Sequence, residues 1–183
     1  MNRGKKIMLL SHCILNCNAK VEGLSSYKSS LIEVVNLLHK EGISIIQLPC
    51  PEMSIYGIKR WGHVKNQFDT PFFRSECRGM LTPIVNQVND YINNGYNVLG
   101  VIGIDGSPSC GVNKTCKGSW GGEFKCIENY KKCVETLEMV NEEGVFIEEL
   151  KKLFKESSLN IPFIALKEEN MEDSVKQLNI QIK

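Results

Sequence analysis

The apolar residues of the chain gather into short runs that are separated by polar and turn residues. Four of these runs have the length of a β-strand and are too short for a buried helix. The third run is rich in Val and Ile, which is typical of a strand that is covered on both faces of a sheet. We therefore predict four strands, over residues 5–11, 43–48, 97–104 and 161–166.

Helical spacing of apolar residues recurs between these runs. In residues 25–40 the apolar positions fall on one helical face, and Ser30 with Glu33 matches a capping box. Thr82 followed by Pro83 predicts the start of a second helix, with an earlier start near Ser75 and a kink at the proline as the alternative. Further helices are predicted over residues 123–138, 145–155 and 171–178.

Two segments without a clear period are predicted as loops. Residues 52–74 contain Gly, Pro and several aromatic residues, and a loop of that length is usually functional. The second predicted loop covers residues 105–122. Strands that alternate with helices indicate an α/β fold, a Rossmann-like three-layer arrangement with a mainly parallel sheet of about four or five strands. We expect a single domain over residues 1–183, because a chain of this length suits one core.

Composition and charge exclude several classes of protein. Hydrophobic residues make up 42% of the chain, charged residues make up 23%, and the net charge is +1 at pH 7. Such a chain presents no broad basic surface, so we expect no nucleic-acid partner. No apolar run approaches the roughly 20 residues that span a bilayer, and the start of the chain lacks the pattern of a signal peptide. We expect a cytoplasmic protein with no membrane partner.

The chain contains eight cysteines, a high number for its length. Disulfide scaffolds are typically short secreted chains without a full core, so reduced thiols are favoured here and metal binding becomes a serious option. Cys126, Tyr130, Cys133 and Leu137 follow helical spacing, and we interpret this stripe as part of the core.

Three of the cysteines stand at the ends of three predicted strands. Cys13 follows the first strand, Cys50 the second and Cys110 the third. Parallel strands have their carboxyl ends at one edge of the sheet, where such sheets bind ligands, so these thiols are expected to converge. A free Cys has a pKa of about 8.5, and three crowded thiolates need a cation to neutralise them.

Two kinds of metal centre suit cysteine ligands. Structural zinc normally takes four ligands that come in close pairs such as C-x2-C, and these cysteines form no such pair. A four-iron cluster is normally held by four thiolates. Three would leave one iron without a protein ligand and open to a substrate, which fits an enzyme.

Residues that can handle protons flank the same cysteines. Glu52 lies two residues after Cys50, close enough to act as an acid or base at the same site. The candidates around the third cysteine are Asp105, Ser107 and Ser109.

Three segments around these cysteines resemble the signature of the thiouracil desulfidases, a family long described as a domain of unknown function. The segments are "SHCILN" at residues 11–16, "CPE" at 50–52 and "SPSCG" at 107–111. Their order and their roughly even spacing along the chain also match the family.

The resemblance implies an oxygen-sensitive [4Fe-4S] cluster held by Cys13, Cys50 and Cys110. It further implies that the open iron takes sulfur from a small thiolated substrate through a [4Fe-5S] intermediate, without net redox change. Water then replaces the sulfur on the carbon, and sulfide leaves later. By the same resemblance, Glu52 and a serine of the "SPSC" turn would handle protons or position the substrate.

The chain departs from the family pattern in two segments. Residues 53–62 replace a Gly- and Pro-rich stretch, and residues 16–22 replace a Tyr-Asp-Gly-type segment. We expect thiouracil or a related thio-compound as the substrate, and the altered pocket favours the related compound. Arg60 and Trp61 are candidate substrate-binding residues that would clamp an aromatic ring by charge and stacking, although Trp61 could equally pack the loop down.

Two other functions are compatible with the cysteines. Cys110 could be the nucleophile of a metal-free sulfurtransferase or hydrolase, although no His has an evident partner position. The chain could also be a non-catalytic iron–sulfur or metal-sensing module, in which Cys17 or Cys116 completes a set of four ligands.

Overall fold

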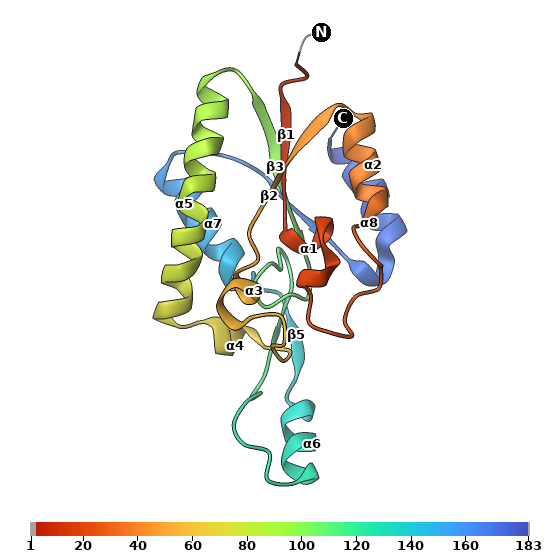
Figure 1. The fold of residues 1–183 in the computed structure, drawn as a ribbon, viewed down its shortest axis with the longest axis vertical. Coiled ribbons are helices and arrows are strands. Elements are labelled where there is room, and N and C mark those ends of the chain that lie inside the picture. Colours follow the sequence, from red (N-terminus) through yellow and green to blue (C-terminus); the bar gives the residue numbers. More distant parts are fainter. Residues whose placement is uncertain (1–2, 183) are drawn as a thin grey trace.

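A computed structural model describes residues 3–182 of the chain (Figure 1). Its centre is a four-stranded sheet in the order β2-β1-β3-β6, and all three pairings are parallel. The strands are β1 (Lys6–Leu10), β2 (Ile43–Gln47), β3 (Asn97–Ile104) and β6 (Phe163–Leu166). Each predicted apolar run therefore contains a strand, and the predicted parallel sheet is confirmed.

Helices cover both faces of this sheet (Figure 1). One face carries α5 (Pro71–Asn93) and α7 (Val145–Glu156), and the other carries α2 (Ile32–Lys40) and α8 (Met171–Gln181). Along β1, Ile7 and Leu9 pack into the cluster with α5 and α7, whereas Met8 and Leu10 pack into the cluster with α2 and α8. This alternation buries both faces of the sheet and confirms the three-layer fold.

The carboxyl ends of β1, β2 and β3 lie at one edge of the sheet, where short helices begin at once (Figure 1). After β1 come α1 (His12–Leu15) and a 3-10 turn (Cys17–Ala19), and after β2 comes α3 (Pro51–Tyr56). Because so few residues separate each strand from its helix, the side chains just past the strands stay next to this edge.

Residues 115–140 form an arm that extends away from the sheet at the same edge (Figure 1). In the arm, β4 (Thr115–Lys117) pairs antiparallel with β5 (Glu138–Val140), and α6 (Ile127–Glu135) lies at the far end. The prediction of a loop over residues 105–122 and a helix over residues 123–138 therefore omitted this two-stranded sheet.

The predicted core stripe on the arm is wrong. No residue of α6 is buried, Cys126 is exposed, and Tyr130 and Leu137 keep much of their surface in contact with solvent. The spacing is helical as predicted, but the helix stands at the tip of the arm, away from both buried clusters. Periodicity alone therefore indicates a helix face without showing what covers it.

The loop predicted over residues 52–74 is also wrong. This segment contains α3, α4 (Lys65–Phe68) and the start of α5. Two of its aromatic residues belong to the core, since Phe68 and Phe73 are fully buried and their stacked rings lie 4.5 Å apart. Thr70 caps α5 by accepting a hydrogen bond from the backbone N–H of Phe73.

Helix α5 runs without interruption through Pro83, so Thr82 is not a helix cap. The Thr82 hydroxyl instead donates to the carbonyl of Arg78, at 2.8 Å. The earlier start that was the alternative is correct, and it lies at Pro71. Among residues 3–182 no helix, α5 included, combines the length and the apolar character needed to cross a membrane.

Helix α2 begins at Ile32 rather than at residue 25, and the predicted capping box is absent. The preceding residues are held by contacts to the start of the chain instead. Cys17 N–H donates to the carbonyl of Ser29 at 2.7 Å, and Leu31 N–H donates to that of Ile14 at 2.8 Å. These tertiary hydrogen bonds take the place of the first helical turns.

The carboxylate of Glu149 is the most buried charge between α5 and α7, with 2% of the residue exposed. Arg74 and Lys152 each place a nitrogen 2.7 Å from its Oε1. Burial opposes ionisation, but the hydrogen bonds from Lys152 and Arg74 outweigh it and hold the pKa of Glu149 below its usual range. The charged form therefore stabilises the packing of these two helices.

Glu149→Gln is expected to lower the free energy of unfolding by about 2 kcal/mol at pH 7. Because the folded-state pKa of Glu149 is lowered, its contribution is present above the unfolded-state pKa and is lost as the pH falls through the folded value. Urea unfolding should show that the difference in free energy of unfolding between the wild type and the variant becomes smaller as the pH is lowered from neutral to about 3.5. A deficit that is equal at both pH values would contradict the assignment. Glu156→Gln, which alters an exposed carboxylate near the same helices, should change stability little.

Candidate functional site

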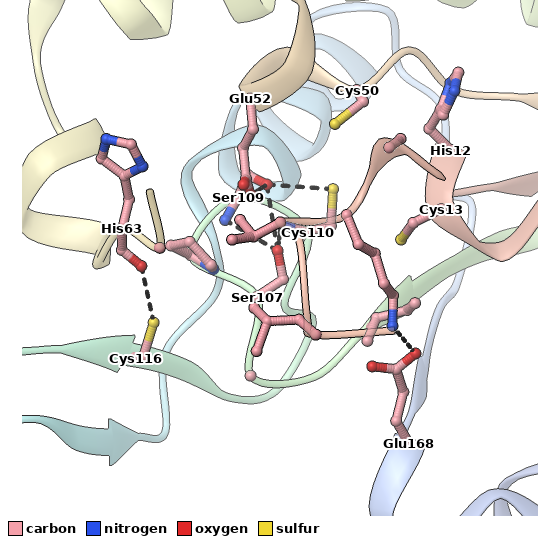
Figure 2. A pocket seen from close by; sticks show the side chains of 18 of the residues that line it. His12, Cys13, Cys50, Glu52, His63, Ser107, Ser109, Cys110, Cys116 and Glu168 are labelled. Atoms are coloured by element: carbon pink, nitrogen blue, oxygen red, sulfur yellow. Dashed lines mark hydrogen bonds and ion pairs between the residues drawn. The ribbon is translucent and has the colours of Figure 1, made fainter. Parts of the chain in front are cut away.

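A cavity of about 380 Å³ opens at the carboxyl ends of β1, β2 and β3. Cys13, Cys50 and Cys110 all line it, as do Glu52 and Ser109. Figure 2 shows the three sulfur atoms in the same part of the cavity, with His63 and Cys116 on its other side. The structure therefore brings the three strand-end thiols together, and we refer to this space as the cysteine cavity.

Local structure directs each thiol into the cavity. Cys13 lies in α1, which starts two residues after β1 ends. Cys50 is the N-cap of α3, where its sulfur accepts a hydrogen bond from Met53 N–H at 3.4 Å and Pro51 occupies the first helical position. A cysteine in a capping position has its side chain turned back toward the helix start and hence toward the sheet edge.

The third thiol, Cys110, sits in a tight turn that Asp105 organises. One oxygen of Asp105, Oδ1, accepts hydrogen bonds from three successive backbone N–H groups, at 2.8–3.2 Å. These donors belong to Val112, Asn113 and Lys114. Asp105 also lines the cavity, and its Oδ2 is buried without a hydrogen-bond partner. Its main structural effect is to close the turn that carries Cys110.

Glu52, Ser109 and Cys110 form a line of contacts inside the cavity (Figure 2). The Ser109 hydroxyl donates to Glu52 Oε1 at 2.5 Å and lies 3.5 Å from the sulfur of Cys110. Ser107 stands behind them, with its Oγ 3.3 Å from that of Ser109 and accepting from Cys110 N–H at 3.0 Å. Both Glu52 and Ser109 are buried, so their hydrogen bond is shielded from water.

Arg60 lines the cavity, where its guanidinium pairs with Glu52. Its Nε donates to Glu52 Oε2 at 3.2 Å and its Nη2 donates to the carbonyl of Ala19 at 2.7 Å. Trp61 is 81% exposed and does not line the cavity. The structure therefore does not form the predicted Arg60–Trp61 clamp, because the guanidinium already has buried partners and the indole faces solvent.

An ion pair between Lys20 and Glu168 lines the same cavity, and sequence reasoning missed it (Figure 2). The Lys20 ammonium also lies 4.7 Å from the centre of the Tyr27 ring, whose hydroxyl donates to the carbonyl of Cys13 at 2.9 Å. Lys20 stands in the segment where the chain departs from the desulfidase pattern. That departure was the available signal, but Glu168 is 148 residues away in the sequence.

Burial controls the protonation of the cavity thiols. It raises the pKa of Cys110 to about 12, helped by repulsion from Cys50, and it raises the pKa of Cys13 well above its usual range. Thiols in this state are poor nucleophiles at neutral pH. Among residues 3–182, His12 Nε2 and His63 Nδ1 are buried without hydrogen-bond partners, so neither of these two nitrogens contacts the thiol of Cys110. The geometry thus disfavours a metal-free cysteine nucleophile.

The predicted donor set of the cavity consists of thiols from three separate segments of the chain. Within residues 3–182, no group of three Cys, His, Asp or Glu side chains is close enough to hold one metal ion. The ligands of a four-iron cluster bind different irons and stand further apart. Cys13, Cys50 and Cys110 could hold such a cluster. Cys17 does not line the cavity, and the thiol of Cys116 contacts the carbonyl of His63 at 3.5 Å.

Comparison with known proteins identifies a relative of this chain. The chain is 35% identical over 156 residues to "Uncharacterized protein MJ0003" of Methanocaldococcus jannaschii, and the match covers 84% of this chain and 99% of that protein. The chain belongs to the MJ0003 family. No protein-family model matches it. Among solved structures it aligns with a [4Fe-4S]-dependent thiouracil desulfidase, TudS, with a TM-score of 0.47 and 17% identity over 96% of this chain and 99% of that chain.

In this member of the MJ0003 family, Gly144 forms part of the support for the cysteine turn. A Cβ at Gly144 would lie 2.3 Å from the carbonyl carbon of Ser109 and 2.8 Å from the nitrogen of Cys110. Gly144 N–H also donates to the carbonyl of Gly111, at 2.9 Å. The start of α7 can approach the turn only because this residue has no side chain. Nothing in the sequence near residue 144 signals this contact.

Gly144→Ala is expected to lower the free energy of unfolding by about 1–3 kcal/mol, because the Ser109–Cys110 peptide must shift to admit the methyl group. Chemical denaturation of the variant and the wild type measures this change. Gly79→Ala is the control, since its Cβ would meet no atom within 4 Å. A Gly144→Ala variant as stable as the wild type would show that the turn adapts without cost.

Proposed function

We propose that this protein is an iron–sulfur-dependent desulfidase, which replaces the sulfur of a small thiolated molecule with oxygen from water. The observation that carries the proposal is the convergence of Cys13, Cys50 and Cys110 on one cavity, beside the Glu52–Ser109 hydrogen bond. These residues belong to the three segments that resemble the desulfidase signature. The residues and their arrangement thus point to the same chemistry.

In this proposal Cys13, Cys50 and Cys110 hold a [4Fe-4S] cluster as thiolates. Positive iron would favour the thiolate form of all three groups. It would thereby offset the effect of burial, which raises the pKa values of Cys13 and Cys110. When bound through three cysteines, the cluster supplies an iron without a protein ligand, which acts as a Lewis acid toward sulfur.

Glu52 and Ser109 are the proposed proton-handling pair. The Ser109 hydroxyl lies between the Glu52 carboxylate and the sulfur of Cys110, so it faces the thiol end of the cavity and can pass a proton to the carboxylate. Arg60 holds the second oxygen of Glu52 and keeps the carboxylate turned toward Ser109. Glu52 thereby serves as the base that activates water, and Arg60 is a positioning residue.

The overall reaction is hydrolytic. A carbon–sulfur double bond and one water give a carbon–oxygen double bond and hydrogen sulfide, so no electrons are gained or lost. The two protons of the water leave with the sulfide. Glu52 can hold one of them while the oxygen attacks the carbon, and return it through Ser109 to the departing sulfur.

The charges of the cavity favour a neutral substrate. Two cations, Lys20 and Arg60, face three carboxylates, Glu52, Asp105 and Glu168. The resulting excess of negative charge disfavours anionic compounds, because an anion would be desolvated next to carboxylates. We therefore expect uncharged thiocarbonyl compounds, such as thiolated heterocycles, to react in preference to thioacids.

Cys13→Ala, Cys50→Ala and Cys110→Ala are each expected to abolish iron binding. The wild type, purified and reconstituted without oxygen, should hold about four irons and four sulfides per chain. Iron and acid-labile sulfide analysis, with absorption spectroscopy, measures both.

Cys17→Ala and Cys116→Ala are the matched controls for this experiment, and both should keep the cluster. A cluster that also needs Cys17 or Cys116 would indicate four protein ligands and would favour the sensing module over the enzyme. A wild type that takes up no iron would overturn the proposal.

Glu52→Gln and Ser109→Ala are expected to slow sulfide release by about 100-fold or more while leaving the iron content unchanged. The reason is that each variant removes a member of the proton-handling pair but no thiol. Sulfide production from 2-thiouracil and related neutral compounds provides the assay. Glu76→Gln, on the exposed face of α5, is the control and should release sulfide at the wild-type rate. Full activity in Glu52→Gln would exclude this carboxylate as the base.

A further inference from the structure

A second hollow of about 280 Å³ lies between the arm and the segment before α4. We call it the apolar groove, and its walls include one carboxylate residue, Glu138, beside His63, Val64, Cys116, Trp120, Leu137 and Met139. The cavity chemistry described above involves none of the last three residues. The groove is thus an unassigned feature beside the proposed active site.

The apolar groove adjoins the cysteine cavity. Gly62, His63, Cys116 and Met139 line both spaces, so these four residues form the neck between them. Figure 2 shows His63 and Cys116 on the side of the cavity that lies away from Cys13. A molecule bound at the three thiols could extend past this neck without leaving the protein surface.

Specific contacts hold the walls of the groove in place. The indole N–H of Trp120 donates to the carbonyl of Gly62 at 2.9 Å, and the thiol of Cys116 donates to that of His63 at 3.5 Å. Trp120 also packs against Phe124 and Tyr130, with ring centres 5.5 and 5.9 Å away. These contacts tie the arm to residues 62–63, so the groove is formed before any ligand binds.

The floor of the groove is apolar and open to solvent. Leu137 is 42% exposed and Met139 is 65% exposed, although both lie next to a cavity with charged walls. Apolar side chains that stay exposed beside a polar cavity are typical of a ligand-binding surface.

We propose that the apolar groove is a second subsite for the same substrate, and that it binds an uncharged alkyl or aryl substituent of the thiolated molecule. This inference rests on the proposed function, and it makes the substrate a compound with two parts. The thiocarbonyl part lies at the three cysteines, and the apolar part passes His63 and Cys116 to lie on Leu137 and Met139. The lining residues that the groove shares with the cysteine cavity are the reason to assign it to the substrate.

Sulfide release from 2-thiouracil and from its 5-propyl, 6-propyl and 6-benzyl derivatives tests the proposal with reconstituted protein. At least one derivative should exceed the parent in kcat/KM by about tenfold or more, because its substituent leaves water for an apolar wall. In parallel, calorimetry should show that the sulfur-free compound, such as 6-propyluracil, binds more tightly than uracil by a similar factor.

In Leu137→Ser and Met139→Ser, the substituted compound should no longer differ from its unsubstituted parent. The ratio of their kcat/KM values and the ratio of their affinities should both be close to one. Ile127→Ser, which removes another exposed apolar side chain of the arm, is the matched control and should keep the wild-type ratios. All three positions are exposed to solvent and lie outside the two buried clusters, so the substitutions leave the core intact.

The two readouts separate this proposal from the proposed function. If no compound yields sulfide but the substituted uracil still binds more tightly, the desulfidase function fails and the subsite stands. If sulfide is released but every ratio is near one in the wild type, the subsite fails and the function stands. A wild type that forms dimers which Leu137→Ser dissociates would show that a second copy covers the groove, and this would also overturn the subsite.

Discussion

Strand β1 pairs in parallel with β2 on one side and with β3 on the other, and the site depends on this arrangement. Parallel pairing places the carboxyl ends of three strands at one edge, and the short connections to α1 and α3 leave no room for the residues that follow to move away. Cys13, Cys50 and Cys110 therefore meet although they are far apart in the sequence. The two buried clusters on either side of the sheet hold the strands in that register.

Burial of three thiols at one edge raises their pKa values. The charged groups around them are held in place by hydrogen bonds. Glu52 is held between Ser109 and Arg60, so its own burial is compensated by hydrogen bonds. One carboxylate oxygen of Asp105 accepts the backbone hydrogen bonds that close the turn of Cys110. A site with this many fixed partners is preorganised, which suits a reaction that moves protons without moving electrons.

The arm gives the cavity a second character. Near the sheet the walls are thiols and charged groups, whereas beyond His63 and Cys116 they are mainly aromatic and aliphatic, with Glu138 as the one charged residue within residues 3–182 that lines the groove. The arm is inserted between β3 and α7, in a connection that contributes nothing to the four-stranded sheet. Of residues 115–140, Cys116 and Met139 also line the cysteine cavity, so the arm contributes to the same space as the three cysteines.

The sequence by itself determined the four strands, the three-layer fold and the strand-end placement of the cysteines, because apolar runs and turn residues report burial and chain reversal locally. It did not reveal that Phe68 and Phe73 are core residues, that the α6 stripe is exposed, or that Arg60 is committed to Glu52. Nor did it reveal the Lys20–Glu168 pair or the contact of Gly144 with the cysteine turn. Those features join segments remote in the chain. Only the tertiary structure decides them, because hydrophobic periodicity shows that a face is apolar and not which surface it meets.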